Sequence, residues 1–172
     1  MKIILIGYMG SGKTTIGKKL ANHLNQKFYD LDKKIIKYTK KSISELFEIY
    51  GEKKFRKLEF NILNCFFKTK KSYILSVGGG TPCYKHNMFL MKQNSKIIYL
   101  NAEINTLFTR ILKQKENRPL ISKLSNNDLY HFICDSLSKR FFFYKKADYT
   151  IYIENKSFLD IVKEICFINN IF

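Results

Sequence analysis

A phosphate-binding loop stands near the start of the chain. Residues 7–14 read Gly-Tyr-Met-Gly-Ser-Gly-Lys-Thr, which matches the pattern G-x-x-x-x-G-K-[ST] at every fixed position. The loop follows the apolar run 3–6, and a helix is expected to begin at Lys13. A buried strand, a glycine loop and a helix N-terminus direct backbone N–H groups at one anion. The sequence therefore predicts a nucleoside triphosphate site; a chance glycine-rich turn is the weaker alternative.

The residues of this loop have expected roles in binding the triphosphate. The Lys13 ammonium would reach the β- and γ-phosphates, and the Thr14 hydroxyl would hold Mg²⁺. The residues expected to contact the phosphates are Gly10, Ser11, Gly12, Lys13, Thr14 and Thr15.

Two further motifs fall at the ends of expected strands, where open parallel sheets bind their ligands. Asp30 and Asp32 are separated by one residue, so both carboxylates are expected on one side of an extended segment. One could support hydrated Mg²⁺ and the other accept a substrate hydroxyl's hydrogen bond; an ordinary polar strand end is the alternative. Gly78, Gly79 and Gly80 would let the backbone approach a ligand closely, with a flexible turn as the alternative.

Arginine is rare in a chain that otherwise uses lysine for its positive charge. The 31 basic residues include only four arginines, at Arg56, Arg110, Arg118 and Arg140. A planar guanidinium binds a carboxylate or phosphate through two parallel hydrogen bonds, which an ammonium does not provide. These positions are therefore candidate ligand contacts. Arg56 has Glu59 one helical turn later, and a surface ion pair is the alternative reading of that pair.

The net charge of +17 would by itself suggest a nucleic-acid or membrane partner. The excess is almost entirely lysine, and asparagine, isoleucine, phenylalanine and tyrosine are also abundant, which is typical of AT-rich codon usage. No specific nucleic-acid partner is therefore expected.

No apolar run reaches the length of about 18 residues that spans a bilayer. The four cysteines form no metal-binding pattern, so we expect free thiols in a cytoplasmic protein.

Alternating strand and helix patterns predict an α/β fold with a five-stranded parallel sheet, helices on both faces and one domain over residues 1–172. Ser44 and Ser157 are expected to cap helices. The polar segment 113–125 is expected to form a mobile lid. The expected strands are 2–6, 27–31, 73–77, 96–100 and 149–153. The expected helices are 13–25, 32–39, 44–50, 52–69, 85–92, 104–112, 126–145 and 157–168.

Taken together, these motifs resemble those of shikimate kinases. The phosphate loop, Asp30-x-Asp32, Phe55-Arg56-x-x-Glu59, the triple glycine and Arg118-Pro119-Leu120 occur in that family's order and spacing over residues 1 to about 153. The resemblance implies a P-loop kinase fold of the nucleoside monophosphate kinase type. It also implies that the ATP γ-phosphoryl group is transferred to the 3-hydroxyl of shikimate, with Mg²⁺. The acceptor would bind in a helical region over about 32–60.

The resemblance implies roles for the charged residues. Asp32 would contact the reacting hydroxyl as base or orienter, and Asp30 would lie near Mg²⁺ and its waters. Arg56 and Arg140 would bind the shikimate carboxylate, and Glu59 would hold Arg56 in place.

The remaining site residues follow from the same resemblance. Gly78, Gly79 and Gly80 would offer backbone to the shikimate ring. Phe47 and Phe55 would line the pocket, although phenylalanines at such positions are more often core residues. Arg118 would bridge the phosphates from the lid, and Arg110 would stack on adenine.

The chain departs from the family pattern at three places. Ile35 is followed by Ile36 and Lys37 where the family has an Ile-Glu pair, and the lid reads Arg-Pro-Leu-Ile. Thr81-Pro82 after the triple glycine is unusual. None of these changes removes a group that the chemistry needs.

Other functions stay open at this stage. A gluconate kinase or a nucleoside monophosphate kinase would share the phosphate loop, but the arginines favour an acidic acceptor and no base pocket is evident. A nucleic-acid-binding ATPase would use the positive charge and predicts steeply salt-dependent binding. A catalytically inactive relative would have lost one of the motif residues, and none is missing. The expected enzyme is a monomer that acts on a small molecule.

Overall fold

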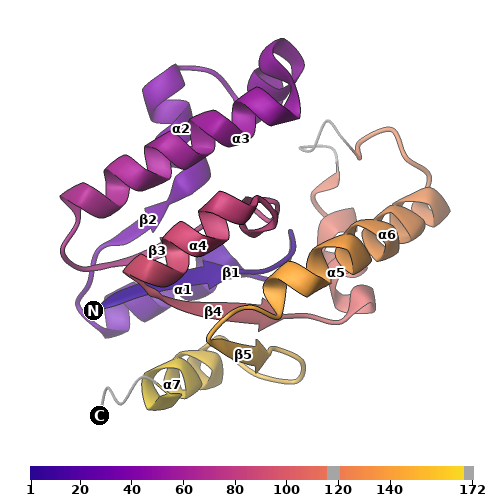
Figure 1. Cartoon of the computed structure of the whole chain (residues 1–172). Coiled ribbons are helices and arrows are strands. Elements are labelled where there is room, and N and C mark those ends of the chain that lie inside the picture. The colour runs from indigo at the N-terminus through magenta and orange to yellow at the C-terminus, as the bar shows by residue number, and fades with distance from the viewer. Residues whose placement is uncertain (116–120, 169–172) are drawn as a thin grey trace.

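The computed structural model describes residues 1–115 and 121–168. Its five strands form one parallel sheet in the order β2-β3-β1-β4-β5 (Figure 1). The α/β fold expected from the sequence is therefore confirmed. The strands are β1 Lys2–Ile6, β2 Phe28–Asp30, β3 Tyr73–Ser76, β4 Lys96–Asn101 and β5 Tyr149–Tyr152.

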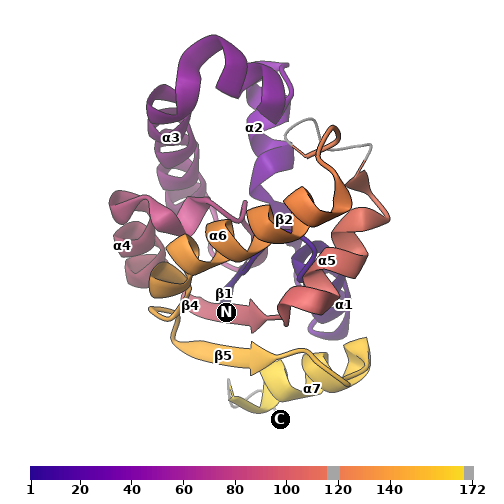
Figure 2. The same ribbon diagram turned by 90° about the vertical axis from the view of Figure 1, so that its right-hand side faces the viewer.

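Helices cover both faces of this sheet. Figures 1 and 2 show α1 and α4 on opposite sides of it, and α7 packs against α1. None of the described helices is long and apolar enough to cross a membrane. The helices are α1 Lys13–His23, α2 Leu31–Thr39, α3 Ile43–Thr69, α4 Lys85–Asn94, α5 Ile104–Leu112, α6 Asn126–Tyr144 and α7 Phe158–Ile168, with a 3-10 turn η1 at Thr81–Cys83.

The central strands are buried on both faces, which explains their continuous apolar sequences. In β1 the side chains of Ile3, Ile4, Leu5 and Ile6 are all fully buried. A side chain on either face of such a strand meets a covering helix, so no polar alternation is needed. This packing fixes the strand ends from which the site loops emerge.

The strand order brings the sequence motifs together. The phosphate loop follows β1, Asp30 ends β2, and the triple glycine follows β3. These three strands are neighbours in the sheet, in the order β2-β3-β1, and all are parallel. Their carboxyl ends therefore meet at one edge, which is where parallel α/β sheets bind ligands.

Two local expectations had different outcomes. The expected break between helices 44–50 and 52–69 is confirmed, because Gly51 has a non-helical backbone (φ 69°, ψ 169°) inside α3. The expectation that Ser44 caps this helix is wrong. The cap is Ser42, whose hydroxyl accepts from Glu45 N at 3.2 Å while the Glu45 carboxylate accepts from Ser42 N at 2.6 Å. This reciprocal capping box satisfies two N–H groups, which Ser44 could not do from within the first turn.

Candidate active site

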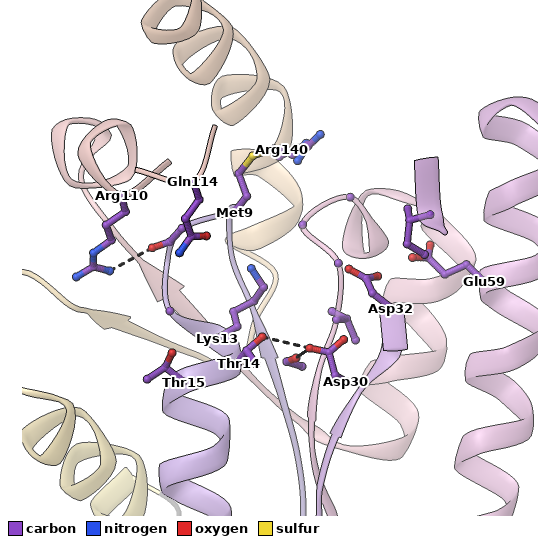
Figure 3. A pocket seen from close by; sticks show the side chains of 18 of the residues that line it. Met9, Lys13, Thr14, Thr15, Asp30, Asp32, Glu59, Arg110, Gln114 and Arg140 are labelled. Atoms are coloured by element: carbon purple, nitrogen blue, oxygen red, sulfur yellow. Dashed lines mark hydrogen bonds between the residues drawn. The ribbon is translucent and has the colours of Figure 1, made fainter. Parts of the chain in front are cut away.

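A cavity of about 620 Å³ opens at the carboxyl edge of the sheet (Figure 3). Nearly all of the sequence-predicted site residues line it. Of the exceptions, Ser11 is fully buried and does not line the cavity. Arg118, with Pro119 and Leu120, lies outside the described residues. The predicted residues that line the cavity are Gly10, Gly12, Lys13, Thr14, Thr15, Asp30, Asp32, Phe47, Phe55, Arg56, Glu59, Gly78, Gly79, Gly80, Arg110 and Arg140.

The phosphate loop has the backbone that its glycines permit. Gly10 and Gly12 have φ values of 83° and 88°, in the left-handed region that residues with a Cβ rarely adopt. The Lys13 ammonium reaches back across the loop and donates to Gly7 O at 2.9 Å and to Tyr8 O at 2.8 Å. The loop, the ammonium and the N-terminus of α1 thus create one electropositive site for an anion.

Asp30 holds several elements together at the end of β2. Its Oδ2 accepts hydrogen bonds from the hydroxyls of Thr14 at 3.2 Å and Ser76 at 3.1 Å. Its Oδ1 accepts from Lys33 N at 3.2 Å and so caps α2. The carboxylate therefore lies beside the hydroxyl of the phosphate loop, and Figure 3 shows this Thr14–Asp30 contact.

The expectation that Asp30 and Asp32 share one side of an extended segment is wrong. β2 ends at Asp30, and Leu31 and Asp32 already belong to the first turn of α2. The chain turns into a helix there because the Asp30 carboxylate caps it. Asp30 thus ends β2 and Asp32 belongs to α2, but both carboxylates line the same cavity.

Asp32 is a carboxylate whose pKa is shifted by its surroundings. Burial is the largest cause that raises its pKa, from 3.8 to about 6. The negative charges of Asp30 and Glu59 act in the same direction, while Lys13 and Arg56 lower the pKa. A carboxylate with a pKa near neutrality is suited to accept a proton at physiological pH. In Figure 3, Asp32 lies between Lys13 and Glu59.

Arg56, which belongs to α3, lines the cavity and is held there by its neighbours. Its Nη1 lies 2.9 Å from Glu59 Oε2, and Nη2 lies 3.4 Å from Oε1 of the exposed Glu52. The guanidinium also lies over the rings of Phe47 and Phe55, at 5.6 Å and 5.3 Å from their centroids. Two aromatic faces and a buried carboxylate therefore orient its planar fork toward the cavity.

Charged side chains pack directly on the backbone of the triple glycine. A Cβ at Gly80 would lie 2.1 Å from Arg56 Nη2, and one at Gly78 would lie 3.1 Å from Asp32 Oδ1. Neither residue has a positive φ, so close approach and not conformational freedom explains the glycines. The sequence predicted close approach to a ligand; the structure adds that protein side chains are the first neighbours.

Arg140, which belongs to α6, is a further charged residue that lines the cavity. Its guanidinium lies 5.3 Å from the centroid of the Tyr8 ring. A Cβ at Gly79 would lie 3.3 Å from Arg140 Nη1. One turn later, the Tyr144 hydroxyl donates to Gly79 O at 2.6 Å, and burial raises the pKa of Tyr144. Arg140 is therefore fixed between the phosphate loop and the glycine loop.

The other end of the cavity is formed by α5 and α7. Arg110 Nη1 donates to Gly10 O at 3.2 Å, which places the guanidinium against the phosphate loop (Figure 3). Gln114 and Phe158 line the cavity near this end and were not among the predicted residues. An arginine and a phenylalanine ring provide flat surfaces of the kind on which a base can stack.

Several polar residues at the site were missed by sequence reasoning. Ser76, Thr81 and Asn87 hydrogen-bond the two carboxylates Asp30 and Glu59. Ser76 had a visible signal, because it is the polar residue within the apolar run that ends β3. Thr81 and Asn87 had none, since their partner lies 22 and 28 residues away in the chain.

Comparison with known proteins agrees with this geometry. A family model described as shikimate kinase matches residues 9–167. A shikimate kinase of Flavobacterium psychrophilum is 45% identical over 165 residues, which cover 95% of this chain and 96% of the relative. The crystal structure of shikimate kinase from Bacteroides thetaiotaomicron has a TM-score of 0.91 and 35% identity, covering 98% of this chain and 97% of that one. A shikimate kinase from Acinetobacter baumannii was solved in complex with shikimate. It has a TM-score of 0.87 and 33% identity, and the match covers 98% of this chain and 92% of that one.

Proposed function

The chain belongs to the shikimate kinase family and is an ATP-dependent kinase acting on shikimate, and we propose that the cavity at the sheet edge carries out the transfer. The observation that carries this proposal is the convergence of Lys13, Asp32, Arg56 and Arg140 on one cavity of about 620 Å³. A phosphate-binding ammonium, a carboxylate poised near neutrality and two guanidinium groups are what a phosphoryl transfer to a hydroxy acid requires.

ATP binds, in this proposal, along the phosphate loop. The backbone of Gly10 to Thr15, including buried Ser11, surrounds the phosphates, and Lys13 exchanges its two carbonyl contacts for phosphate oxygens. Arg110 stacks on the adenine at the α5 end of the cavity. Support comes from the left-handed glycines and from the contact between Arg110 and the loop.

Shikimate binds at the α3 side, within the region of about 32–60 and the glycine loop. Arg56 and Arg140 bind its carboxylate, and Glu59 orients Arg56. The backbone around Gly79 contacts the ring, and the paired rings of Phe47 and Phe55, 4.3 Å apart, form an apolar wall. The complex of the Acinetobacter relative with shikimate supports this acceptor.

The chemical step joins the acceptor oxygen to the γ-phosphorus and breaks that phosphorus' bond to the bridging oxygen of ADP. Asp32 orients the 3-hydroxyl and accepts its proton, for which a pKa of about 6 is suitable. Lys13 stabilises the negative charge that develops on the transferred group. Arg118 does the same from the lid of about 113–125, where the neighbouring Lys113 and Gln114 line the cavity.

Mg²⁺ fits the donors present beside the phosphate loop. Thr14 Oγ1 and the Asp30 carboxylate lie 3.2 Å apart and offer the hard oxygen ligands that Mg²⁺ prefers. Thr14 would bind it directly and Asp30 through water; when bound, it neutralises phosphate charge.

All groups in this proposal come from one chain, so a monomer suffices. A cytoplasmic location is included, because ATP is the phosphoryl donor and the four cysteines are free thiols. Neither part of the proposal requires a nucleic-acid or membrane partner.

The test is ADP release with Mg-ATP in the presence of shikimate, gluconate, a panel of nucleoside monophosphates or no acceptor. We expect turnover with shikimate and only background with the others. An Arg56→Ala variant should raise the KM for shikimate while leaving the KM for ATP unchanged. Turnover with another acceptor, or an unchanged shikimate KM in the variant, would overturn the assignment of this cavity.

A further inference from the structure

We propose that Thr81 and Asn87 are positioning residues for the acceptor clamp, the pair Arg56 and Arg140 that binds the shikimate carboxylate. They act by holding the Glu59 carboxylate in the orientation that fixes the Arg56 guanidinium. The inference rests on the proposed role of Arg56 in binding the shikimate carboxylate. It assigns a purpose to Thr81, which follows the triple glycine where the sequence departs from the family pattern.

Glu59 is a buried carboxylate whose two oxygens are both occupied. Only 1% of its surface is exposed. Its Oε1 accepts from the Thr81 hydroxyl at 2.6 Å, and its Oε2 accepts from Asn87 Nδ2 at 3.1 Å and Arg56 Nη1 at 2.9 Å. A buried charge is tolerated only when it is paired and hydrogen-bonded. The neutral donors of Thr81 and Asn87 therefore supply hydrogen bonds that the Arg56 guanidinium does not make.

Asn87 is a buried amide with one unsatisfied polar atom. Its side chain is fully buried, and Nδ2 also donates to Thr81 O at 3.2 Å. Its Oδ1 has no hydrogen-bond partner in the described part of the chain. An orphaned buried acceptor is destabilising, so the amide is explained by its donor hydrogens and not by stability.

These bonds connect α3 with two elements that follow it later in the chain. Glu59 belongs to α3, Thr81 to η1 directly after the glycine loop, and Asn87 to α4. Arg56 Nη2 meanwhile lies against Gly80, where a Cβ would be only 2.1 Å away. The network thus fixes the guanidinium relative to the loop on which the acceptor ring rests.

Loss of the Thr81 hydroxyl leaves Glu59 Oε1 without its donor. The carboxylate then rotates toward Arg56, which remains its charged partner. This rotation draws the guanidinium away from the acceptor. It therefore weakens binding of an acceptor carboxylate without altering the ATP side of the cavity.

The experiment compares Thr81→Val with Thr81→Ser, which restores the hydroxyl. We expect the shikimate KM to rise about tenfold in the valine variant, with the ATP KM and kcat within about twofold of wild type, and to recover in the serine variant. Thr69→Val, which removes an exposed hydroxyl at the end of α3, is the matched control. Asn87→Leu should raise the shikimate KM as well, with Asn94→Leu on the same helix as its control.

Shikimate methyl ester separates positioning from general damage, because it lacks the charged carboxylate. The valine variant should bind the ester as wild type does. An equal loss for acid and ester, or no loss for the acid in either the Thr81 or the Asn87 variant, overturns the inference. If Arg56→Ala also leaves the shikimate KM unchanged, the proposed clamp itself fails; if it raises the KM while both other variants do not, only the positioning role fails.

Discussion

Replacing Asp32 with asparagine is expected to stabilise the folded protein while it lowers turnover. Burial and neighbouring carboxylates raise the pKa of Asp32 from 3.8 to about 6 in the fold. One pKa unit corresponds to about 1.4 kcal/mol, so the ionised carboxylate lowers the free energy of unfolding by about 3 kcal/mol relative to the neutral acid. Asparagine has nearly the same shape and no charge, and it removes this unfavourable contribution.

The stabilisation should depend on pH in a defined direction. Above about pH 6 the carboxylate is ionised in both the folded and unfolded states, so its full unfavourable contribution is present. Between about 6 and 3.8 the folded state binds a proton that the unfolded state lacks, and stability recovers as the pH falls. Below 3.8 both states are neutral, and the advantage of Asp32→Asn disappears.

The assay is urea unfolding of the protein without substrates at about pH 7.5 and about pH 4. Asp32→Asn should be more stable than wild type by up to about 3 kcal/mol at the higher pH and by less than about 1 kcal/mol at the lower. Asp135→Asn, an exposed carboxylate on α6, is the control and should change neither value. Equal stability of wild type and Asp32→Asn at the higher pH would refute the reasoning. Turnover should fall by about a hundredfold or more.

Three further outcomes are expected. The kcat/KM of the wild type should fall as the pH drops through about 6, because protonated Asp32 accepts no hydroxyl proton; a profile flat to well below that pH would contradict this. Gly80→Ala should raise the shikimate KM by about tenfold, because its Cβ would lie 2.1 Å from Arg56 Nη2; an unchanged KM in steady-state assays would count against the observed packing. Arg110→Ala should raise the ATP KM by about fivefold and leave that of shikimate unchanged, since the guanidinium contacts Gly10 O; calorimetric titration with ADP provides an independent check.

The phosphate loop could be assigned from the sequence because its chemistry is local. Gly10, Gly12, Lys13 and Thr14 act through the backbone and side chains of one short turn, so their spacing encodes their geometry. The sheet could also be predicted, since buried parallel strands have continuous apolar sequences. The strand ends then brought Asp30 and the triple glycine to the same edge, as the strand order confirms.

Two local predictions were wrong, the cap of α3 and the extended segment from Asp30 to Asp32. In each case a hydrogen bond from a side chain to the backbone sets where a helix begins. Ser42 and not Ser44 caps α3, because Ser42 forms the reciprocal pair with Glu45. Asp30 turns the chain into α2 by capping Lys33 N, so the segment to Asp32 is not extended. Residue type alone does not distinguish such neighbouring positions, because each of them carries a suitable side chain.

The residue types that do the chemistry, and their order along the chain, could be identified without the fold. The packing of Arg56 on Gly80, and the hydrogen bonds from Thr81 and Asn87 to Glu59, became evident only in the folded chain. These contacts join residues more than 20 positions apart, and no periodicity of a helix or strand relates them. They form because burying a carboxylate requires donors from whichever elements the packing brings near, which is a property of the assembled fold.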